Sequence, residues 1–378
     1  MEKCYDIRRN AALAVFIGFA AVIAAAAGIY DYFYLKRAAV FWGLPEQGKW
    51  WKRILAVLVA VAAVPVINLF GVWALIVLYI SGFAVLMDFI QLIAKKLPGE
   101  KKHWNKVYRS GLLPIFITAV VIVYSFWNMR NVRVTEYTVH TEKEIRDEGY
   151  KICLISDLHF PTTMNSSKLE EYCRDISSKE ADAVVLCGDI VDERSTKAEM
   201  ERTFQVLSGI TAKFGIYYVY GNHDRAHYSR KAPFTEEELK KAIADTGIRV
   251  LKDEAVAVND EFTIIGRDDR SVAGRMPSKD LLQGVDENDF LLLLDHQPVE
   301  LKENAAAGYD LQLSGHTHAG QMWPVGPLTT LFRMVELNYG FRKEGDFQAI
   351  VTSGIGGWGY SLRTGKHSEY VIIKIMGK

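Results

Sequence analysis

The sequence predicts an α/β layered sandwich preceded by an all-α domain of four membrane-spanning helices. Two observations lead to this prediction. Long apolar stretches are confined to residues 1–128, and short apolar runs that alternate with helix-like stretches fill residues 129–378. Alternation of the second kind is typical of sheets covered by helices. We therefore place a transmembrane domain in residues 1–128 and a water-soluble domain in residues 129–378.

Four apolar segments are predicted to cross the membrane, at residues 11–30, 54–68, 72–94 and 112–127. The first carries no charge and is long enough for a hydrocarbon core of about 30 Å. A signal peptide is the alternative there, because Arg8 and Arg9 precede the apolar run, but the later segments favour a span. Pro65, Asn68 and Gly71 separate the second span from the third. A buried soluble bundle is the alternative for all four, but soluble helices of this length normally show a polar face.

Basic residues in the short loops predict the orientation of the spans. The loop between the first two spans holds Lys36, Arg37, Lys49, Lys52 and Arg53, and the loop between the last two holds Lys95, Lys96, Lys101, Lys102, Lys106 and Arg109. Both loops are expected in the cytoplasm, which leaves both termini outside. Lys3, Arg8 and Arg9 argue the other way, but they are outnumbered. We predict a multi-pass protein of the cell membrane with an extracytoplasmic second domain.

The charge balance and the cysteines exclude some classes of protein. The 45 basic side chains equal the 45 acidic ones, so no overall positive field exists to attract nucleic acid. We expect the lipid bilayer as a partner and no nucleic acid. Cys153, Cys173 and Cys187 lie in or beside apolar runs without a C-x-x-C pair, which favours free buried thiols over a disulfide.

Eight apolar runs of the second domain are predicted to be strands because each ends on polar residues or glycine. They are KICLIS, AVVLCGD, IYYVYGN, FTIIGR, FLLLLDH, LQLSGH, QAIVTSG and YVIIKI. A further segment, RVTEYTVHT, alternates as a half-buried strand does. Helices are expected at residues 167–179, 196–207 and 235–245. The last opens with Thr235 and Glu238, the residues of a capping box.

Polar side chains gather where these strands end. They are Asp157 and His159 in SDLH, Asp189 and Asp192 in GDIVD, Asn222, His223 and Asp224 in GNHD, His296 in LLDHQP, and His316 and His318 in SGHTH. Oxygen and imidazole donors suit divalent or trivalent ions such as Mn, Fe and Zn, and the absence of cysteine argues against a structural zinc site. Glycines precede three of these groups, at positions where we expect the chain to turn sharply. Each residue alone has an ordinary explanation in a turn or a hydrogen bond, whereas the ordered set does not.

These motifs resemble the calcineurin-like metallophosphoesterase family. The matching pattern is D-x-H, G-D-x-x-D, G-N-H-D, a lone His and G-H-T-H, in the family's order, over about residues 132–375. GHTHAGQMWP and SDLHF are most similar to the bacterial membrane-associated branch, apart from Ala319, where that branch usually has glycine. The resemblance implies a four-layer α/β/β/α sandwich and a hydrolase of phosphoester bonds, whose substrate we expect to be a small-molecule or lipid phosphoester.

The resemblance also implies a centre of two metal ions. One ion would take Asp157, His159 and His318, the other would take Asn222, His296 and His316, and Asp189 would bridge them. Two cations about 3.5–4 Å apart can hold a hydroxide for in-line attack on phosphorus. His223, not a ligand in the family pattern, would protonate the leaving oxygen. Asp224 or Asp192 would orient a neighbouring imidazole.

Other residues are candidates for substrate binding. Arg363 is a candidate phosphate clamp because a guanidinium group suits phosphate oxygens, and Arg267 and Arg270 are weaker candidates. The segment after GHTH is rich in large apolar residues, notably Met322, Trp323, Leu331, Phe332 and Met334. A lid or a surface that accepts an acyl chain is one interpretation of it, and core packing is the other.

Three classes of function are compatible with this sequence. The first is a phosphomonoesterase or phosphodiesterase at a membrane surface, acting on a lipid or lipid-linked substrate. The second is an inactive metal-dependent sensor or binding module, for which the loss of a ligand or of His223 would argue, and none is missing. The third is a transporter with a regulatory domain. Transport has little support, because the predicted spans contain Asp88 as their only acid and no pair of broken helices. Asp88 itself is expected at the membrane interface.

Overall fold

A computed structural model describes residues 2–69, 71–99, 101–229 and 231–377, and in the first helix it describes side chains at 14, 15 and from 17 onward. The chain divides into two compact units, Met1–Tyr124 and Ser125–Lys378. The division lies four residues before the boundary predicted from composition, within the last apolar helix. The units are treated separately below.

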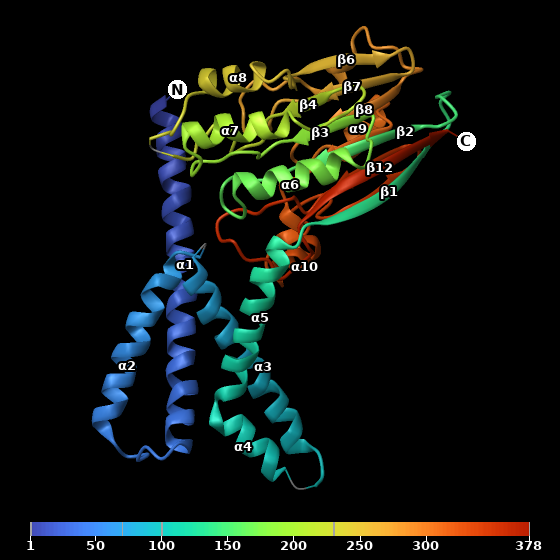
Figure 1. Cartoon of the computed structure of the whole chain (residues 1–378). Helices are drawn as coiled ribbons and strands as arrows, with labels where there is room; N and C mark the ends of the chain where they lie inside the picture. Colours follow the sequence, from blue (N-terminus) through green and yellow to red (C-terminus); the bar gives the residue numbers. More distant parts are fainter. Residues whose placement is uncertain (1, 70, 100, 230, 378) are drawn as a thin grey trace. The chain divides into compact units, whose positions relative to one another are not determined.

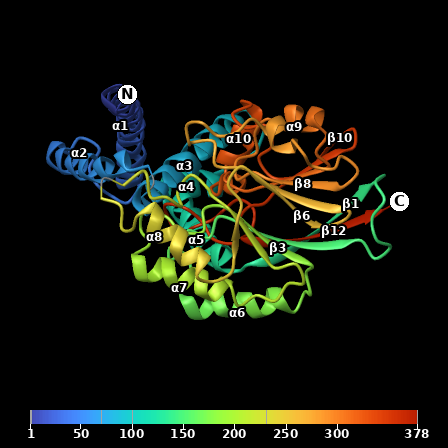
Figure 2. The same cartoon turned by 90° about the horizontal axis from the view of Figure 1, so that it is seen from above.

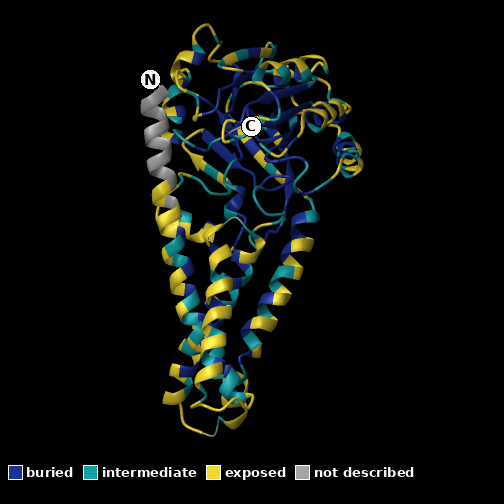
Figure 3. Cartoon of the chain, turned by 90° about the vertical axis from the view of Figure 1, so that its left-hand side faces the viewer, coloured by how far each residue is buried: buried dark blue, intermediate teal, exposed yellow. Residues whose placement is uncertain are grey.

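The first unit is entirely helical. Its elements are α1 (Glu2–Phe41), α2 (Lys49–Ala63), η1 (Val64–Ile67), α3 (Val72–Lys96), α4 (Lys102–Ser110) and most of α5 (Leu112–Arg130). Four helices are long and apolar enough to cross a membrane, at Ile17–Phe41, Lys49–Ile67, Val72–Lys96 and Leu112–Arg130. Many of their large apolar side chains are exposed, as expected for surfaces that face lipid (Figure 3).

The helix boundaries follow from local sequence. Pro65 lies at the start of η1, where its missing N–H costs little, and Gly71 is the N-cap of α3. Lys95 and Lys96 occupy the last turn of α3, where positive charge is favourable. The first helix is longer than the predicted 11–30 and contains Asp31, so Asp88 is not the only acid in the candidate spans.

The polar side chains of these helices pair with one another. Asp31 is buried and accepts a 2.9 Å hydrogen bond from the hydroxyl of Ser81. Asp88 accepts hydrogen bonds from Tyr30 at 2.7 Å, from Arg37 at 2.7 Å and from Tyr108 at 2.8 Å. Acidic groups inside a membrane domain are costly unless they are paired, and both of these are.

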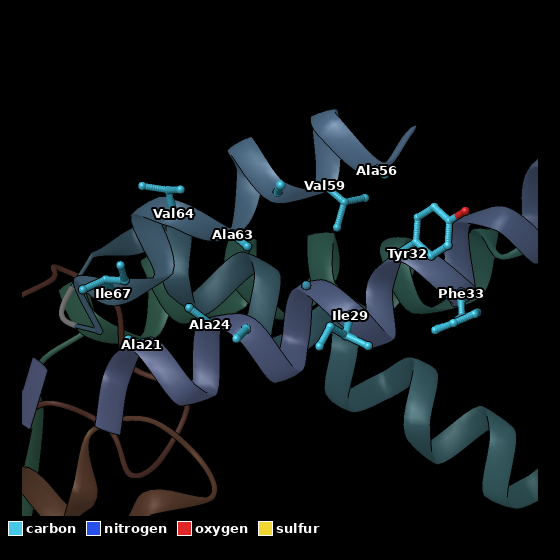
Figure 4. Close-up of a pocket in the computed structure, with 13 residues that line it drawn as sticks. Ala21, Ala24, Ile29, Tyr32, Phe33, Ala56, Val59, Ala63, Val64 and Ile67 are labelled. Atoms are coloured by element: carbon cyan, nitrogen blue, oxygen red, sulfur yellow. The ribbon is translucent and has the colours of Figure 1, made fainter. Parts of the chain in front are cut away.

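A cavity of about 580 Å³ opens between α1 and the pair formed by α2 and η1 (Figure 4). The two helices approach closely at Gly28, where a Cβ would lie 3.1 Å from that of Ala63, and the small side chains nearby leave the rest of the space open. Its lining contains no charged side chain, so it offers no group for catalysis.

The second unit contains two six-stranded sheets (Figure 1). The first has the order β1 (Arg133–Thr141), β12 (Glu369–Gly377), β2 (Tyr150–Ile155), β3 (Ala183–Cys187), β4 (Ile216–Val219) and β5 (Arg249–Val250). The second has the order β10 (Gly340–Glu344), β11 (Phe347–Val351), β9 (Leu311–Ser314), β8 (Phe290–Leu294), β7 (Phe262–Gly266) and β6 (Glu254–Asn259). Strands β2 to β5 are parallel, and so are β7, β8, β9 and β11, so the carboxyl ends of each set lie at one edge.

Helices cover the outer faces of both sheets, as Figure 2 shows. The first sheet carries α6 (Ser166–Ser177), α7 (Lys197–Leu207) and α8 (Glu236–Ala244), and the second carries α9 (Leu301–Ala307). In β2, Ile152 and Leu154 pack between the sheets, whereas Cys153 and Ile155 pack under the helices. Strands buried on both faces explain the continuous apolar runs of the sequence. The predicted α/β/β/α order of layers is confirmed.

All nine predicted strands and the three predicted helices are present. The sequence analysis missed three strands, β5, β6 and β10, and three short helices, α4, α9 and α10 (Val325–Leu331). The predicted capping box is present, with Thr235 and Glu238 satisfying each other's backbone N–H. Cys153, Cys173 and Cys187 are free and buried, as predicted.

Candidate metal centre

Two groups of three side chains meet at the carboxyl ends of the parallel strands. They are Asp157, His159 and His318 in the first group, and Asp189, His296 and His316 in the second. Within each group the ligand atoms lie no more than 4.8 Å apart, as the ligands of one ion must. The residues follow strands β2, β3, β8 and β9, so both sheets contribute to the site.

Asp189 lies between the two groups. Its Oδ2 is 3.1 Å from Nε2 of His296 and 3.6 Å from Nε2 of His159. Asn222 joins the second group, because its Oδ1 lies 2.8 Å from Nδ1 of His316. The seven side chains singled out in the sequence therefore lie together in one site.

Four ring nitrogens of this site lack a hydrogen-bond partner among the described residues. Both nitrogens of His159, Nε2 of His296 and Nδ1 of His318 are buried and unpartnered among the described residues. Some carboxylate oxygens are near, such as Asp192 at 3.3 Å from Nδ1 of His159, but outside hydrogen-bond geometry. Buried polar atoms normally have partners, so these nitrogens fit a site for cations. His296 shows the arrangement well, since its Nδ1 lies 2.8 Å from the carbonyl of Cys187 and Nε2 remains for an ion.

The backbone at the ligands is strained. Five of the seven ligands have a positive φ, namely Asp157 at 56°, His159 at 44°, Asp189 at 55°, His316 at 68° and His318 at 50°. Residues with a Cβ avoid this region, at a cost of about 1–2 kcal/mol each. Such strain is common at functional sites, where the position of the side chain outweighs the energetic cost of the backbone conformation.

The glycines next to the ligands serve two different purposes. Gly188 has φ +78°, in agreement with the sharp turn that we predicted. The other two have no positive φ and instead provide space. A Cβ at Gly221 would lie 2.2 Å from Oδ1 of Asp189, and one at Gly315 would lie 2.2 Å from Oδ2 of Asp157. The chain turns directly after both glycines, at Asn222 and His316, so close packing rather than a left-handed backbone explains glycine at these two positions.

The charge states of Asp189, His316 and His318 suit cation binding. Burial opposes the ionisation of Asp189, but His296 and His223 hold its pKa well below the usual range. Burial lowers the pKa of His316 to about 4 and holds that of His318 well below its usual range, which keeps both rings neutral at pH 7. An anionic carboxylate and neutral imidazoles are the forms that bind metal ions.

His223 lies beside the two groups without belonging to either. Its Nδ1 is 3.0 Å from Oε2 of Glu193, and its ring packs against Tyr228 and Trp358 at centroid distances of 4.9 and 5.2 Å. Burial lowers the pKa of His223, but Asp189 and Glu193 more than compensate and raise it to about 9. Bound cations would take up the charge of Asp189 and leave Glu193 as the group that favours the imidazolium. The sequence analysis missed Glu193, although it directly follows the GDIVD motif.

Asp192 and Asp224 have different surroundings. Asp192 lies near His159, as described above, whereas the carboxylate of Asp224 accepts backbone N–H groups. The donors are Asp189 at 2.7 Å, Ile190 at 2.8 Å, Val191 at 3.1 Å and Gly221 at 2.6 Å. Asp224 thus binds the two ligand loops to each other, which differs from the role of orienting an imidazole that we expected.

Arg363 is not available as a phosphate clamp. Its side chain is 0% exposed, and it donates hydrogen bonds to the carbonyls of His318 at 3.0 Å and Gly356 at 2.6 Å. Because both hydrogen bonds go to backbone carbonyls, the guanidinium group holds the loop of His318 in place rather than facing a substrate. The prediction that Arg363 binds substrate is corrected accordingly.

The two weaker candidates for phosphate binding, Arg267 and Arg270, differ from each other in exposure. Arg267 is buried and donates to the carbonyl of Met276 and the carboxylate of Glu300, whereas Arg270 is exposed. In the apolar segment after GHTH, Met322 is buried, but Trp323 and the residues that follow it are largely exposed. Core packing therefore explains only the first residue of that segment.

Comparisons with known proteins agree with this geometry. The family model for Calcineurin-like phosphoesterase matches residues 150–320, from β2 to just beyond His318. An uncharacterized metallophosphoesterase of Aquifex aeolicus is 31% identical over 271 residues, which are 70% of this chain and 99% of that protein. The chain belongs to the calcineurin-like phosphoesterase family. In this metallophosphoesterase, all seven residues of the candidate metal centre lie within the matched residues.

Other relatives extend the comparison. A protein of Danio rerio named transmembrane protein with metallophosphoesterase domain is 26% identical over 313 residues, 79% of this chain and 70% of that protein. A solved dimetal phosphatase from Danio rerio superimposes with a TM-score of 0.37 at 11% identity, covering 54% of this chain and 87% of that one. That superposition is too weak to support an argument.

Proposed function

We propose that this phosphoesterase is anchored in the cell membrane and uses two metal ions to hydrolyse a phosphomonoester or phosphodiester of a lipid or lipid-linked molecule. The observation that carries the proposal is the position of Asp189, 3.1 Å from His296 and 3.6 Å from His159. One carboxylate between two sets of ligands suits a pair of cations, for which Mn, Fe and Zn are the candidates.

Two such cations, when bound, supply an activated water and neutralise the phosphoryl oxygens. The oxygen of water forms a bond to phosphorus, the ester P–O bond breaks, and the leaving oxygen takes up a proton. His223 is the proposed donor of that proton. Glu193, at 3.0 Å from Nδ1, holds the ring and leaves Nε2 for the leaving group.

The test is product release from the metal-loaded full chain in detergent, with a panel of soluble phosphomonoesters, soluble phosphodiesters and membrane lipids. We expect turnover that a chelator abolishes and that added metal restores. An Asp189→Asn variant should lose it. Metal uptake without turnover on any substrate would favour the alternative, an inactive metal-dependent sensor.

We also propose that the catalytic unit lies outside the cytoplasm, because basic residues concentrate near the end of α1 and in the first turns of α2, and again from the end of α3 to the start of α5. The test is a cysteine introduced at Lys240, an exposed position on α8. A membrane-impermeant maleimide should label Lys240→Cys in intact cells. Labelling only after lysis would reverse the orientation.

A further inference from the structure

The segment that follows His318 exposes an unusual amount of apolar surface. We call it the apolar face, and it consists of Trp323, Val325, Leu328, Leu331, Phe332 and Met334, on and around α10. The last three side chains are 71%, 68% and 70% exposed. Of the ten large apolar side chains exposed after α5 in the described part of the chain, six belong to this face. Such a concentration on one surface marks an interaction site.

The apolar face is connected to the end of the last apolar helix. The backbone N–H of Trp323 donates to Oγ1 of Thr364 at 2.8 Å. The neighbouring Arg363 donates its N–H to the carbonyl of Ser125 at 3.1 Å, and its carbonyl accepts from Asn128 at 3.1 Å. Ser125 and Asn128 are in the last turns of α5, a candidate span that ends at Arg130. Where α5 leaves a bilayer, the apolar face is therefore close to the lipid surface.

A cavity of about 700 Å³ lies between the apolar face and the metal centre. Its lining includes His316 of the metal centre and Met334 of the apolar face. Its lining holds four basic side chains, those of Arg270, Lys302, Arg333 and Arg342, and one acidic side chain, that of Glu336, which accepts backbone hydrogen bonds at 2.8 and 3.1 Å. Arg342 lies 3.3 Å from Glu344, whereas the other three form no ion pair within the described ranges. The cavity thus offers unpaired positive charge beside the metal ligands.

Arg333 occupies a position that glycine normally fills. Helix α10 ends in hydrogen bonds from the N–H of Arg333 to Thr330 and from the N–H of Met334 to Thr329, with Arg333 at φ 51°. This is the Schellman arrangement, in which the left-handed residue is usually glycine. A side chain that costs about 1–2 kcal/mol in this conformation brings a cation to the cavity.

We propose that the apolar face and this cavity together bind an anionic lipid. The acyl chains would lie on the apolar face and the charged headgroup in the cavity, with its phosphoester directed to the metal centre. The charge of the cavity selects an anionic headgroup, and the link to α5 selects a bilayer as its source. This inference rests on the proposed function and names the substrate class for the same site.

Contact with lipid can be measured without turnover. In a Cys4→Ser background, the full chain with Leu331→Cys carries the environment-sensitive dye NBD and is placed in nanodiscs of phosphatidylglycerol. We expect blue-shifted emission that lipids with a doxyl label on the acyl chain quench. The same dye at Lys240→Cys on α8 should emit as in water and resist this quenching.

Headgroup binding is measured as inhibition of a soluble aryl phosphodiester by short-chain phosphatidylglycerol. Arg333→Gly removes the cation and relieves the backbone strain, so a loss of binding cannot come from a destabilised turn. We expect its inhibition constant to rise about ten-fold for phosphatidylglycerol and to stay unchanged for phosphatidylcholine. Lys240→Ala, which removes an exposed cation elsewhere, should leave both constants unchanged.

The two results are separable from the proposed function. Unquenched, water-like emission at Leu331→Cys would overturn the inference even if the aryl ester is hydrolysed. Shielding that doxyl lipids do not quench and that depends on protein concentration would mean that a second copy covers the face, which also overturns it. If doxyl lipids quench the dye but the protein hydrolyses no substrate, the proposed function is wrong and the lipid contact is supported. Equal inhibition constants for Arg333→Gly and the wild type would remove the headgroup site.

Discussion

The two units both bury polar side chains, but they satisfy them differently. In the helical unit, Asp88 accepts three hydrogen bonds and Asp31 accepts one, and only Arg37 Nε and Thr118 Oγ1 lack a partner among the buried side-chain atoms of its described residues. In the catalytic unit, four imidazole nitrogens at the metal centre are unpartnered. Buried polar atoms that have hydrogen-bond partners within the protein need no ligand, whereas buried polar atoms without partners indicate a ligand site. The comparison separates polar residues that hold helices together from polar residues that bind ions.

The largest effect should come from the residue between the two ligand groups. Asp189→Asn should lower turnover by at least about 10³-fold, because several kcal/mol of charge stabilisation depend on the ions. Elemental analysis should find fewer than two ions per chain. The matched variant of the helical unit, Asp88→Asn, should still bind both ions. Equal metal loss in the two variants would mean that the two polar clusters do not differ in metal binding.

The next effect should come from His223, which lies beside the ions without binding them. His223→Ala should reduce turnover of an alkyl ester by about 10²–10⁴-fold, the usual contribution of a general acid. The loss should be much smaller for a nitrophenyl ester, whose leaving group needs no proton. Metal content should not change. A uniform loss across leaving groups would show that His223 acts in some other way.

Glu369 is a buried carboxylate of the catalytic unit that accepts hydrogen bonds, as Asp31 and Asp88 do in the helical unit. We therefore expect Glu369 to contribute to stability rather than to bind an ion. Burial opposes its ionisation, but hydrogen bonds from His367, Thr135 and the backbone of Ser353 hold its pKa at about 2, below the ordinary 4.5. Its stabilising effect is therefore complete above about pH 4.5 and disappears as the pH falls towards 2, a difference of about 3 kcal/mol.

The measurement is thermal unfolding of the wild type and Glu369→Gln between pH 3 and 7. At pH 7 the variant should be less stable by about 3 kcal/mol, and the gap should narrow as the pH falls. A gap that does not depend on pH would assign the loss to packing rather than to the charge of Glu369.

The smallest effect should come from the helical unit. Asp88→Asn weakens the hydrogen bonds to Tyr30, Arg37 and Tyr108, and such bonds between membrane helices contribute about 0.6–1 kcal/mol each. The melting temperature in detergent should fall slightly, while turnover of a soluble ester stays the same. A loss of turnover comparable to that of Asp189→Asn would show that the two clusters are functionally linked.

Sequence patterns predicted long elements and motif positions well and short elements poorly. Continuous apolar runs identified β2, β3 and β8 because both faces of these strands are buried. The two-residue β5 and the seven-residue α9 and α10 carry too few residues for a periodic signal. Asp31 was left outside the first span because hydropathy alone does not show that Ser81 on another helix pairs with it.

By itself, the sequence determined that the chain has an apolar helical part, an α/β part and seven potential ligands in a family's order, because hydrophobic periodicity and motif spacing are local properties. Only the tertiary structure decided how each side chain is used. It buried Arg363 against two carbonyls, gave Asp224 to the backbone of the ligand loops, and brought Glu193 to His223. These outcomes depend on which atoms meet across sheets and loops far apart in the chain, and residue type and spacing do not specify such contacts.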